Sequence, residues 1–131
     1  MAGCDLNRRW INTNETLYPE VYYPKEMIMK MSKQRPIEFI CDLHGHSNQF
    51  DVFSYGNKIE SEPLANRVYP LMLSKINKKF NFNYCSEKMP KSKKGTARIS
   101  LFTELNEIPN IFTLEASFAG VNNVKNFSYI Y

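Results

Sequence analysis

The chain has 131 residues, which is enough for one modest hydrophobic core and too few for two domains. Its hydrophobic content of 43% and aromatic content of 14% exclude a disordered chain. The net charge of +4 is accompanied by no RNA-binding signature, so we expect no nucleic-acid partner.

Two features of the chain bear on where the protein acts. No apolar run approaches the roughly 18 residues that a membrane span needs, and no signal peptide is visible. The cysteines Cys4, Cys41 and Cys85 are odd in number and widely scattered. We therefore expect a reducing, cytoplasmic setting and no membrane partner.

The first half of the chain predicts one helix and two strands. The helix covers 19–34, with Pro19 in its first turn and apolar residues near helical spacing. An apolar run over 37–43 predicts a short buried strand, and a second short strand is predicted over 50–53. Because α/β proteins place ligands at strand ends, the residues that follow the first strand are candidates for a site.

The second half predicts a helix followed by two strands. The helix covers 63–79, and Pro70 inside it predicts a kink or a break into two pieces. Strands are predicted over 97–102 and 111–118. Since strands and helices alternate, the sequence predicts an α/β fold in which helices flank a mixed β-sheet. The second helix has an apolar face made of Leu64, Val68, Leu71, Met72 and Ile76.

The only two histidines, His44 and His46, lie one residue apart behind the first predicted strand. Both would project to the same side if the strand continued, which suits two ligands of one metal ion, or one ligand and one neighbour. A metal-bound histidine commonly donates its other ring N–H to a carboxylate, for which Asp42 is a candidate. The alternative is a pair of solvated or hydrogen-bonded histidines at a strand-to-loop junction.

Glu115 is an acidic residue inside the otherwise apolar strand predicted over 111–118. Alternation places it on the same side as Thr113 and Ser117. One interpretation is a general base that a rigid strand holds, where desolvation raises its pKa. The alternative is a strand with one solvated face.

Two other groups of residues have both a functional and a structural interpretation. Lysines gather in 88–94, which would suit an acidic partner or phosphate, or would form a solvated loop. Alternatively, His44 could bind zinc together with Cys41 and Cys85, although the spacing of these residues matches no structural zinc module.

Four segments follow one another in an order that resembles a known family. The segments resemble the consecutive motifs of the cytosolic carboxypeptidases, the branch of the zinc carboxypeptidases whose members trim glutamates from tubulin and other proteins. The resemblance spans 2–120, which is nearly the whole chain. The segments are 3–10 (GCDLNRRW), 42–47 (DLHGHS), 94–98 (KGTAR) and 112–120 (FTLEASFAG).

The resemblance implies which residues bind the substrate. Asn7 and Arg8 would grip the free carboxylate at the C-terminus of the substrate, because a guanidinium matches a carboxylate bidentately. Arg98 would favour an acidic side chain at the end of the substrate. His46 would lie in the pocket without binding the metal.

The resemblance also implies which residues carry the chemistry. His44 would be one ligand of a catalytic zinc. Glu115 would be the general base, since zinc lowers the pKa of a bound water toward about 7 and a nearby carboxylate can take its proton. The expected cofactor is therefore zinc.

The chain also departs from the pattern of this family. The family's His-Pro-Gly-Glu motif supplies the first two zinc ligands and lies upstream of the Asn-Arg motif, and neither this motif nor the upstream Arg that stabilises the oxyanion has a counterpart here. We therefore expect residues 1–131 to be the C-terminal portion of a zinc-carboxypeptidase catalytic domain, inactive alone. A half-domain should also expose the face that its missing strands would cover.

The expected function is that of a zinc-dependent metallocarboxypeptidase that removes glutamates from protein or peptide substrates with glutamate-rich tails, tubulin among them. The expected location is the cytoplasm, in association with the cytoskeleton. The alternative is a non-catalytic remnant of the same fold, which would bind acidic tails near Arg8 and Arg98 without cutting them.

Overall fold

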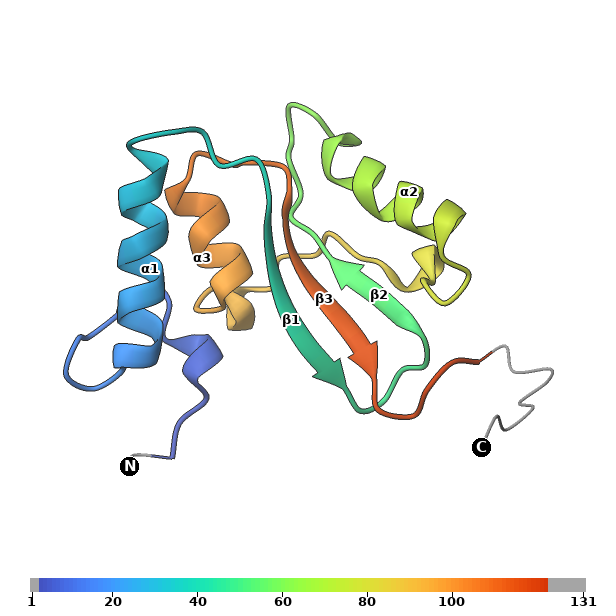
Figure 1. Ribbon diagram of the computed structural model, residues 1–131, viewed down its shortest axis with the longest axis horizontal. Coiled ribbons are helices and arrows are strands. Elements are labelled where there is room, and N and C mark those ends of the chain that lie inside the picture. Colours follow the sequence, from blue (N-terminus) through green and yellow to red (C-terminus); the bar gives the residue numbers. More distant parts are fainter. Residues whose placement is uncertain (1–2, 123–131) are drawn as a thin grey trace.

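The computed structural model describes residues 3–122 of the chain (Figure 1). None of the helices in this part of the chain is both long and apolar enough to cross a membrane. The helices are α1 (Pro19–Ser32), α2 (Val68–Ile76) and α3 (Ala97–Glu104), and the strands are β1 (Ile40–His46), β2 (Val52–Tyr55) and β3 (Ile111–Ser117). Short 3₁₀ turns are formed by Leu6–Arg8, Ala65–Arg67, Phe82–Tyr84 and Lys91–Lys93.

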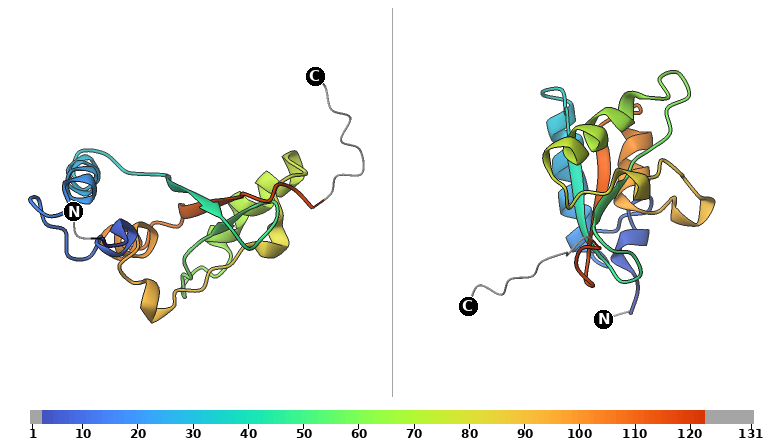
Figure 2. Two further views of the ribbon diagram at one scale, coloured as in Figure 1. Left: turned by 90° about the horizontal axis from the view of Figure 1, so that it is seen from below. Right: turned by 90° about the vertical axis from the view of Figure 1, so that its right-hand side faces the viewer.

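The three strands form one mixed sheet in the order β1-β3-β2. β3 pairs with β1 in parallel and with β2 antiparallel, which confirms the predicted mixed sheet flanked by helices. Helices α1 and α3 lie together beyond β1, and α2 lies beyond β2 (Figures 1 and 2). β3 is thus the central strand, and residues on it have neighbours on both sides.

The hydrophobic core lies where α1 and α3 meet the beginnings of β1 and β3. Leu101 and Ile111 are fully buried in this core, and Trp10 packs against it from the N-terminal segment. A buried lysine of α1, Lys25, pairs with Glu104 of α3 at 2.6 Å and donates to the carbonyl of Trp10. These contacts fasten the N-terminal segment to both helices.

The two predicted strands at 37–43 and 50–53 form later in the chain than expected. β1 begins at Ile40, because the Ile40 amide is the first to donate to the neighbouring segment, at 2.9 Å from the carbonyl oxygen of Asn110. β2 begins at Val52, directly after Asp51, whose φ of 68° interrupts an extended chain. The histidines therefore lie inside β1 and not behind it.

The prediction of a strand over 97–102 is wrong, since these residues form helix α3. The apolar residues alternate as in a half-buried strand, but all six side chains from Ala97 to Phe102 are buried. Arg98 and Ser100 have hydrogen-bond partners inside the protein, so the polar positions do not mark a solvated face. The backbone bonds of Ser100 to Thr96 and of Leu105 to Leu101 are helical.

The helix predicted over 63–79 is broken, as Pro70 indicated. The turn at Ala65–Arg67 precedes α2, and Pro70 is then the third residue of α2, where a missing N–H costs no helical hydrogen bond. The predicted apolar face is largely exposed to solvent. The exposed fractions run from 43% to 81% for Leu64, Val68, Leu71, Met72 and Ile76.

Gly95 is packed so closely that a side chain cannot fit. An added Cβ would lie 2.5 Å from the backbone oxygen of Arg8, and the Gly95 carbonyl also accepts a hydrogen bond from the Trp10 amide at 3.1 Å. We predict that Gly95→Ala lowers the free energy of unfolding by about 1–3 kcal/mol, measured by urea unfolding. Gly3→Ala is the control, because nothing lies within 4 Å of its Cβ. Equal stability of the two variants would contradict this packing.

Candidate functional site

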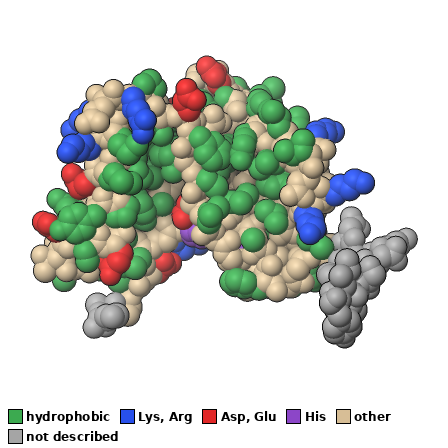
Figure 3. Space-filling model, viewed as in Figure 1, with side chains coloured by type: hydrophobic (Ala, Val, Ile, Leu, Met, Phe, Trp, Pro, Cys, Tyr) green, Lys and Arg blue, Asp and Glu red, His purple; other side chains and the backbone are tan. Residues whose placement is uncertain are grey.

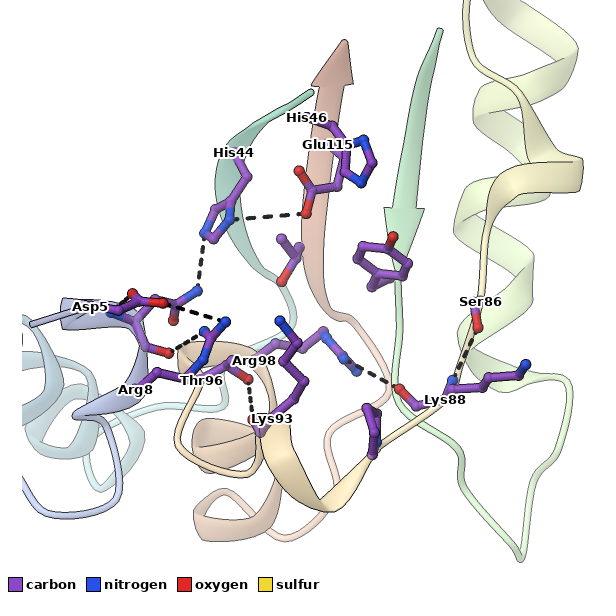
Figure 4. A pocket seen from close by; sticks show the side chains of 14 residues that line it. Asp5, Arg8, His44, His46, Ser86, Lys88, Lys93, Thr96, Arg98 and Glu115 are labelled. Atoms are coloured by element: carbon purple, nitrogen blue, oxygen red, sulfur yellow. Dashed lines mark hydrogen bonds and ion pairs between the residues drawn. The ribbon is translucent and has the colours of Figure 1, made fainter. Parts of the chain in front are cut away.

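A cavity of about 520 Å³ opens at the C-terminal ends of β1 and β3 (Figure 4). It is enclosed by the N-terminal segment, the ends of these strands, β2 and the loop that leads to α3. The structure brings all the residues predicted for the site into this one cavity. They are Asn7, Arg8, His44, His46, Arg98 and Glu115.

The sheet register places His44 beside Glu115. The two residues are direct partners in the parallel pairing of β1 with β3, so their side chains project from the same face. The Nδ1 atom of His44 lies 4.0 Å from Oε1 of Glu115, and a dashed line marks this contact in Figure 4. Because a neutral Nδ1 and a carboxylate oxygen are both acceptors, the pair can jointly hold a water molecule or a cation.

The orientation of His44 is fixed by Asp42 on the same strand. The Nε2 atom lies 2.8 Å from Oδ2 of Asp42 and 3.3 Å from Nδ2 of the Asn7 side chain. The shorter contact assigns the proton of a neutral ring to Nε2, which donates to Asp42 and leaves the lone pair on Nδ1 facing Glu115. Asp42 thus has the orienting position that the sequence indicated.

Glu115 is buried, with 7% of its surface exposed. The interpretation of a strand with one solvated face therefore does not hold at this residue. Burial raises the pKa of the Glu115 carboxyl above its usual range, and the neighbouring His44 and His46 offset part of this shift. The site contains a carboxylate that accepts a proton more readily than an exposed one would.

His46 lines the cavity, but one of its ring nitrogens is already engaged. Its Nδ1 accepts hydrogen bonds from the amides of Asn48 and Gln49, at 3.3 and 3.1 Å. Its ring also packs edge-on against Phe53, with the centroids 5.2 Å apart. These contacts make His46 part of the cavity wall, so it lies in the predicted pocket.

Asn7 and Arg8 reach the cavity from the 3₁₀ turn near the N-terminus. Oδ1 of Asn7 accepts a hydrogen bond from the Ala97 amide at the start of α3, at 2.8 Å. The Arg8 guanidinium donates to the carbonyl of Asn7 at 2.9 Å and pairs with Asp5 at 3.4 Å. The first interaction ties the predicted carboxylate-binding pair to the helix that carries Arg98.

Arg98 is a buried guanidinium, 6% exposed, at the base of the cavity. It donates to the carbonyl of Gly56, to Oδ1 of Asn57 at 2.7 Å and to the carbonyl of Lys88 at 3.4 Å. Burial lowers its pKa to about 10, so the group keeps its charge at neutral pH. No carboxylate of residues 3–122 lies within 4.0 Å of it.

Several cavity residues were not predicted from the sequence. Lys88 and Lys93 belong to the lysine-rich loop, which the sequence left open between a binding and a solvated role. Tyr55 and Thr113 line the cavity because they are direct partners in the pairing of β2 with β3, on the same face as Glu115. Alternation along the last strand gave a signal for Thr113, and no pattern in the sequence indicated Tyr55.

Comparison with known proteins finds relatives of one family, the cytosolic carboxypeptidases. No protein-family model matches the chain. The chain is 38% identical over 125 residues to cytosolic carboxypeptidase 3 of Bos taurus and 40% identical over 124 residues to cytosolic carboxypeptidase 2 of Danio rerio. Each alignment covers 92% of this chain, but it covers only 12% and 17% of the respective relative. The chain therefore spans less than a fifth of these curated relatives.

A solved structure has the same fold over most of this chain. A metallo-carboxypeptidase from Burkholderia cenocepacia matches with a TM-score of 0.73 at 19% sequence identity. The match covers 89% of this chain and 30% of that chain. The described residues thus have the fold of one part of a metallo-carboxypeptidase.

The residues in the cavity do not by themselves fit a complete catalytic zinc. Such a site has three protein ligands, and no group of three or more His, Cys, Asp or Glu side chains within 3–122 could hold a metal ion. The considered combination of Cys41, His44 and Cys85 is therefore not formed. The imidazole of His44 is a single donor of the right chemistry.

The hydrogen bond between Asn7 and Ala97 yields a test of how the cavity is assembled. Asn7→Ala leaves the Ala97 amide without its side-chain acceptor, so we predict a loss of about 1–3 kcal/mol in the free energy of unfolding, measured by thermal or urea unfolding. Asn7→Asp keeps an acceptor oxygen beside the start of α3 and should retain most of the stability. An alanine variant as stable as the original protein would refute this role.

Proposed function

Because the chain is homologous to one segment of the cytosolic carboxypeptidases, we propose that it forms the substrate-binding and general-base side of a zinc-dependent metallocarboxypeptidase site. The observation that carries the proposal is the shared cavity, in which cations, an oriented imidazole and a buried carboxylate face one another. Hydrolysis at a peptide C-terminus needs these groups: cations for the terminal carboxylate and a base for water.

Asn7 and Arg8 bind the C-terminal carboxylate of the substrate in this proposal. The Arg8 side chain is 34% exposed, and its contact with Asp5 at 3.4 Å is one that a peptide carboxylate can replace. The planar guanidinium can then offer two parallel N–H donors to the two carboxylate oxygens. His46 forms part of the wall against which the substrate lies.

Glu115 is the proposed general base. It takes a proton from water as the water oxygen attacks the carbonyl carbon of the last peptide bond, and it passes that proton to the leaving nitrogen as the C–N bond breaks. Its raised pKa suits both transfers, since the carboxylate binds the proton firmly enough to carry it. His44 is proposed as the one zinc ligand that this segment contributes.

We further propose that the substrates are proteins or peptides with glutamate-rich tails, tubulin among them, and that the reaction is deglutamylation. The charge of the cavity supports this choice, because Arg98, Lys88 and Lys93 line it without a carboxylate within 4.0 Å in the described part of the chain. Buried and partly enclosed cations favour an anionic ligand. The word "cytosolic" in the names of the relatives supports action in the cytoplasm.

We propose that residues 1–131 act as the C-terminal portion of a larger catalytic domain and are inactive alone. The single imidazole donor supports this, and so does the apolar face of α2, whose side chains are exposed by 43% to 81%. Hydrophobic side chains gather on the molecular face drawn in Figure 3, over the sheet and α2. Exposed apolar surface of this kind is typical of a contact with further protein.

A non-catalytic protein that binds acidic tails is the second candidate. The cations around the cavity favour it as much as they favour the enzyme, because they would hold a glutamate-rich peptide without any reaction. The two functions differ in one outcome. A longer protein that binds such a peptide and releases no glutamate would support the binding function.

The proposed chemistry predicts that a longer protein, which contains this segment together with further zinc ligands, releases free glutamate from a polyglutamylated peptide. Glu115→Gln should lower the rate by about 10²- to 10⁴-fold, because the amide cannot accept the proton of water. An enzyme-coupled glutamate assay measures this rate. Glu62→Gln is the matched control, since Glu62 is exposed and outside the cavity. Equal rates for the two variants would exclude Glu115 as the base.

The proposed larger domain predicts that one surface change affects the stability of a longer protein more than that of the 131-residue chain. Met72→Gln combined with Ile76→Gln should change the free energy of unfolding of the 131-residue chain by less than about 1 kcal/mol, because both side chains are more than half exposed. It should also reduce the binding of a hydrophobic dye. In a longer protein the same double change should lower the melting temperature. An unchanged melting temperature there would argue against coverage of α2.

A further inference from the structure

Two lysines of the loop before α3, Lys88 and Lys93, line the cavity, but they differ in how their side chains lie. Lys93 lines the cavity, whereas its neighbours Lys91 and Lys94 do not. In Figure 4 the Lys93 side chain rises between Arg8 and Arg98, toward His44 and Glu115. The Lys88 side chain, by contrast, extends away from Glu115 in the same view. Lys93 is therefore the lysine that a ligand in the cavity would meet.

The backbone on both sides of Lys93 is held in place. Its amide donates to the carbonyl of Pro90 at 2.9 Å. Its carbonyl accepts from both the amide and the hydroxyl of Thr96, at 3.0 and 2.8 Å. Thr96 is itself buried and precedes α3 directly. The position of Lys93 relative to the helix that carries Arg98 is thus fixed by three hydrogen bonds, although its side chain is free to reach a ligand.

Arg98 alone can offer only some of its hydrogen-bond donors to a carboxylate. A guanidinium has five N–H donors, and three of those of Arg98 are directed to Gly56, Asn57 and Lys88. Two donors therefore remain for a ligand. Neither Arg98 nor Lys93 has a carboxylate of residues 3–122 within 4.0 Å, so both cations are available to an anion that enters the cavity.

The number of charges around the cavity also points to an acidic residue. Four cations line it, Arg8, Lys88, Lys93 and Arg98, against the carboxylates of Asp5 and Glu115, which leaves a surplus of two positive charges. A C-terminal residue with an acidic side chain carries two negative charges, one on the main-chain carboxylate and one on the side chain. The surplus would thus be neutralised by one such residue.

We propose that Lys93 is a specificity-determining residue that holds the acidic side chain of the last substrate residue together with Arg98. The inference rests on the proposed function, in which Asn7 and Arg8 hold the main-chain carboxylate. It assigns to one lysine of the loop a role that the others do not share. The preference for an acidic residue then depends on two cations from the same stretch of chain, the exposed Lys93 and the buried Arg98.

The test compares the affinities of three peptides that differ only at the last residue. The first ends in glutamate and the second in glutamine, both with a free main-chain carboxylate, and the third ends in glutamate with an amidated main-chain carboxylate. Fluorescence anisotropy with the full 131-residue chain measures each dissociation constant. We expect Lys93→Gln to weaken the binding of the glutamate peptide roughly three- to tenfold, since a partly exposed charge pair is lost. The affinity for the glutamine peptide should stay within about twofold of its original value. Lys93→Arg should restore the preference.

Lys94→Gln is the matched control, because it removes the same charge from an exposed neighbour outside the cavity. It should leave all three affinities within about twofold of the original values. Equal effects of Lys93→Gln and Lys94→Gln would overturn the proposal, and so would an equal loss for the glutamate and glutamine peptides. The amide peptide tests the proposed function separately: if it binds the original chain as tightly as the free glutamate peptide, no terminal carboxylate is recognised.

Discussion

The parallel register between β1 and β3 is the constraint on which the whole cavity depends. It pairs His44 with Glu115, and it places Asp42 beside Thr113 two residues earlier. Since side chains alternate along a strand, a slip of one residue in β1 would turn the imidazole to the opposite face of the sheet. The central position of β3, paired on both sides, is what keeps the buried carboxylate in place.

The other walls of the cavity are held to this sheet by a small set of polar contacts between distant segments. Asn7 accepts a hydrogen bond from Ala97, and the Trp10 amide donates to Gly95. The carbonyl of Trp10 accepts from Ser100 as well, at 3.0 Å. The N-terminal segment and α3 are therefore positioned as one unit, which explains why Asn7, Arg8 and the buried Arg98 line the same cavity although they are far apart in sequence.

The sequence predicted which residues line the cavity more accurately than it predicted the bounds and types of the helices and strands. The residues at the cavity were found because their types and local order are characteristic, as in the run from Asp42 to Ser47. The helix α3 was missed because its apolar residues alternate, and only the packing of the polar Arg98 and Ser100 against internal partners makes a fully buried helix acceptable there. The start of β1 was misplaced because pairing with β3, and not local hydrophobicity, decides where a strand begins.

The lysine-rich loop shows why composition could not settle the remaining part of the site. A run of lysines has one average property, its charge, but the direction of each side chain depends on how the backbone is anchored. The hydrogen bonds from Thr96 hold the carbonyl of Lys93, which lines the cavity, whereas its neighbours Lys91 and Lys94 do not. Three of the four cations around the cavity, Arg8, Lys88 and Lys93, lie in turns or a loop and Arg98 lies in helix α3, while the buried carboxylate of Glu115 comes from the central strand. In the proposed function, the general base is therefore held on a strand that is paired on both sides, and such a fixed position is what a base that acts on a bound peptide requires.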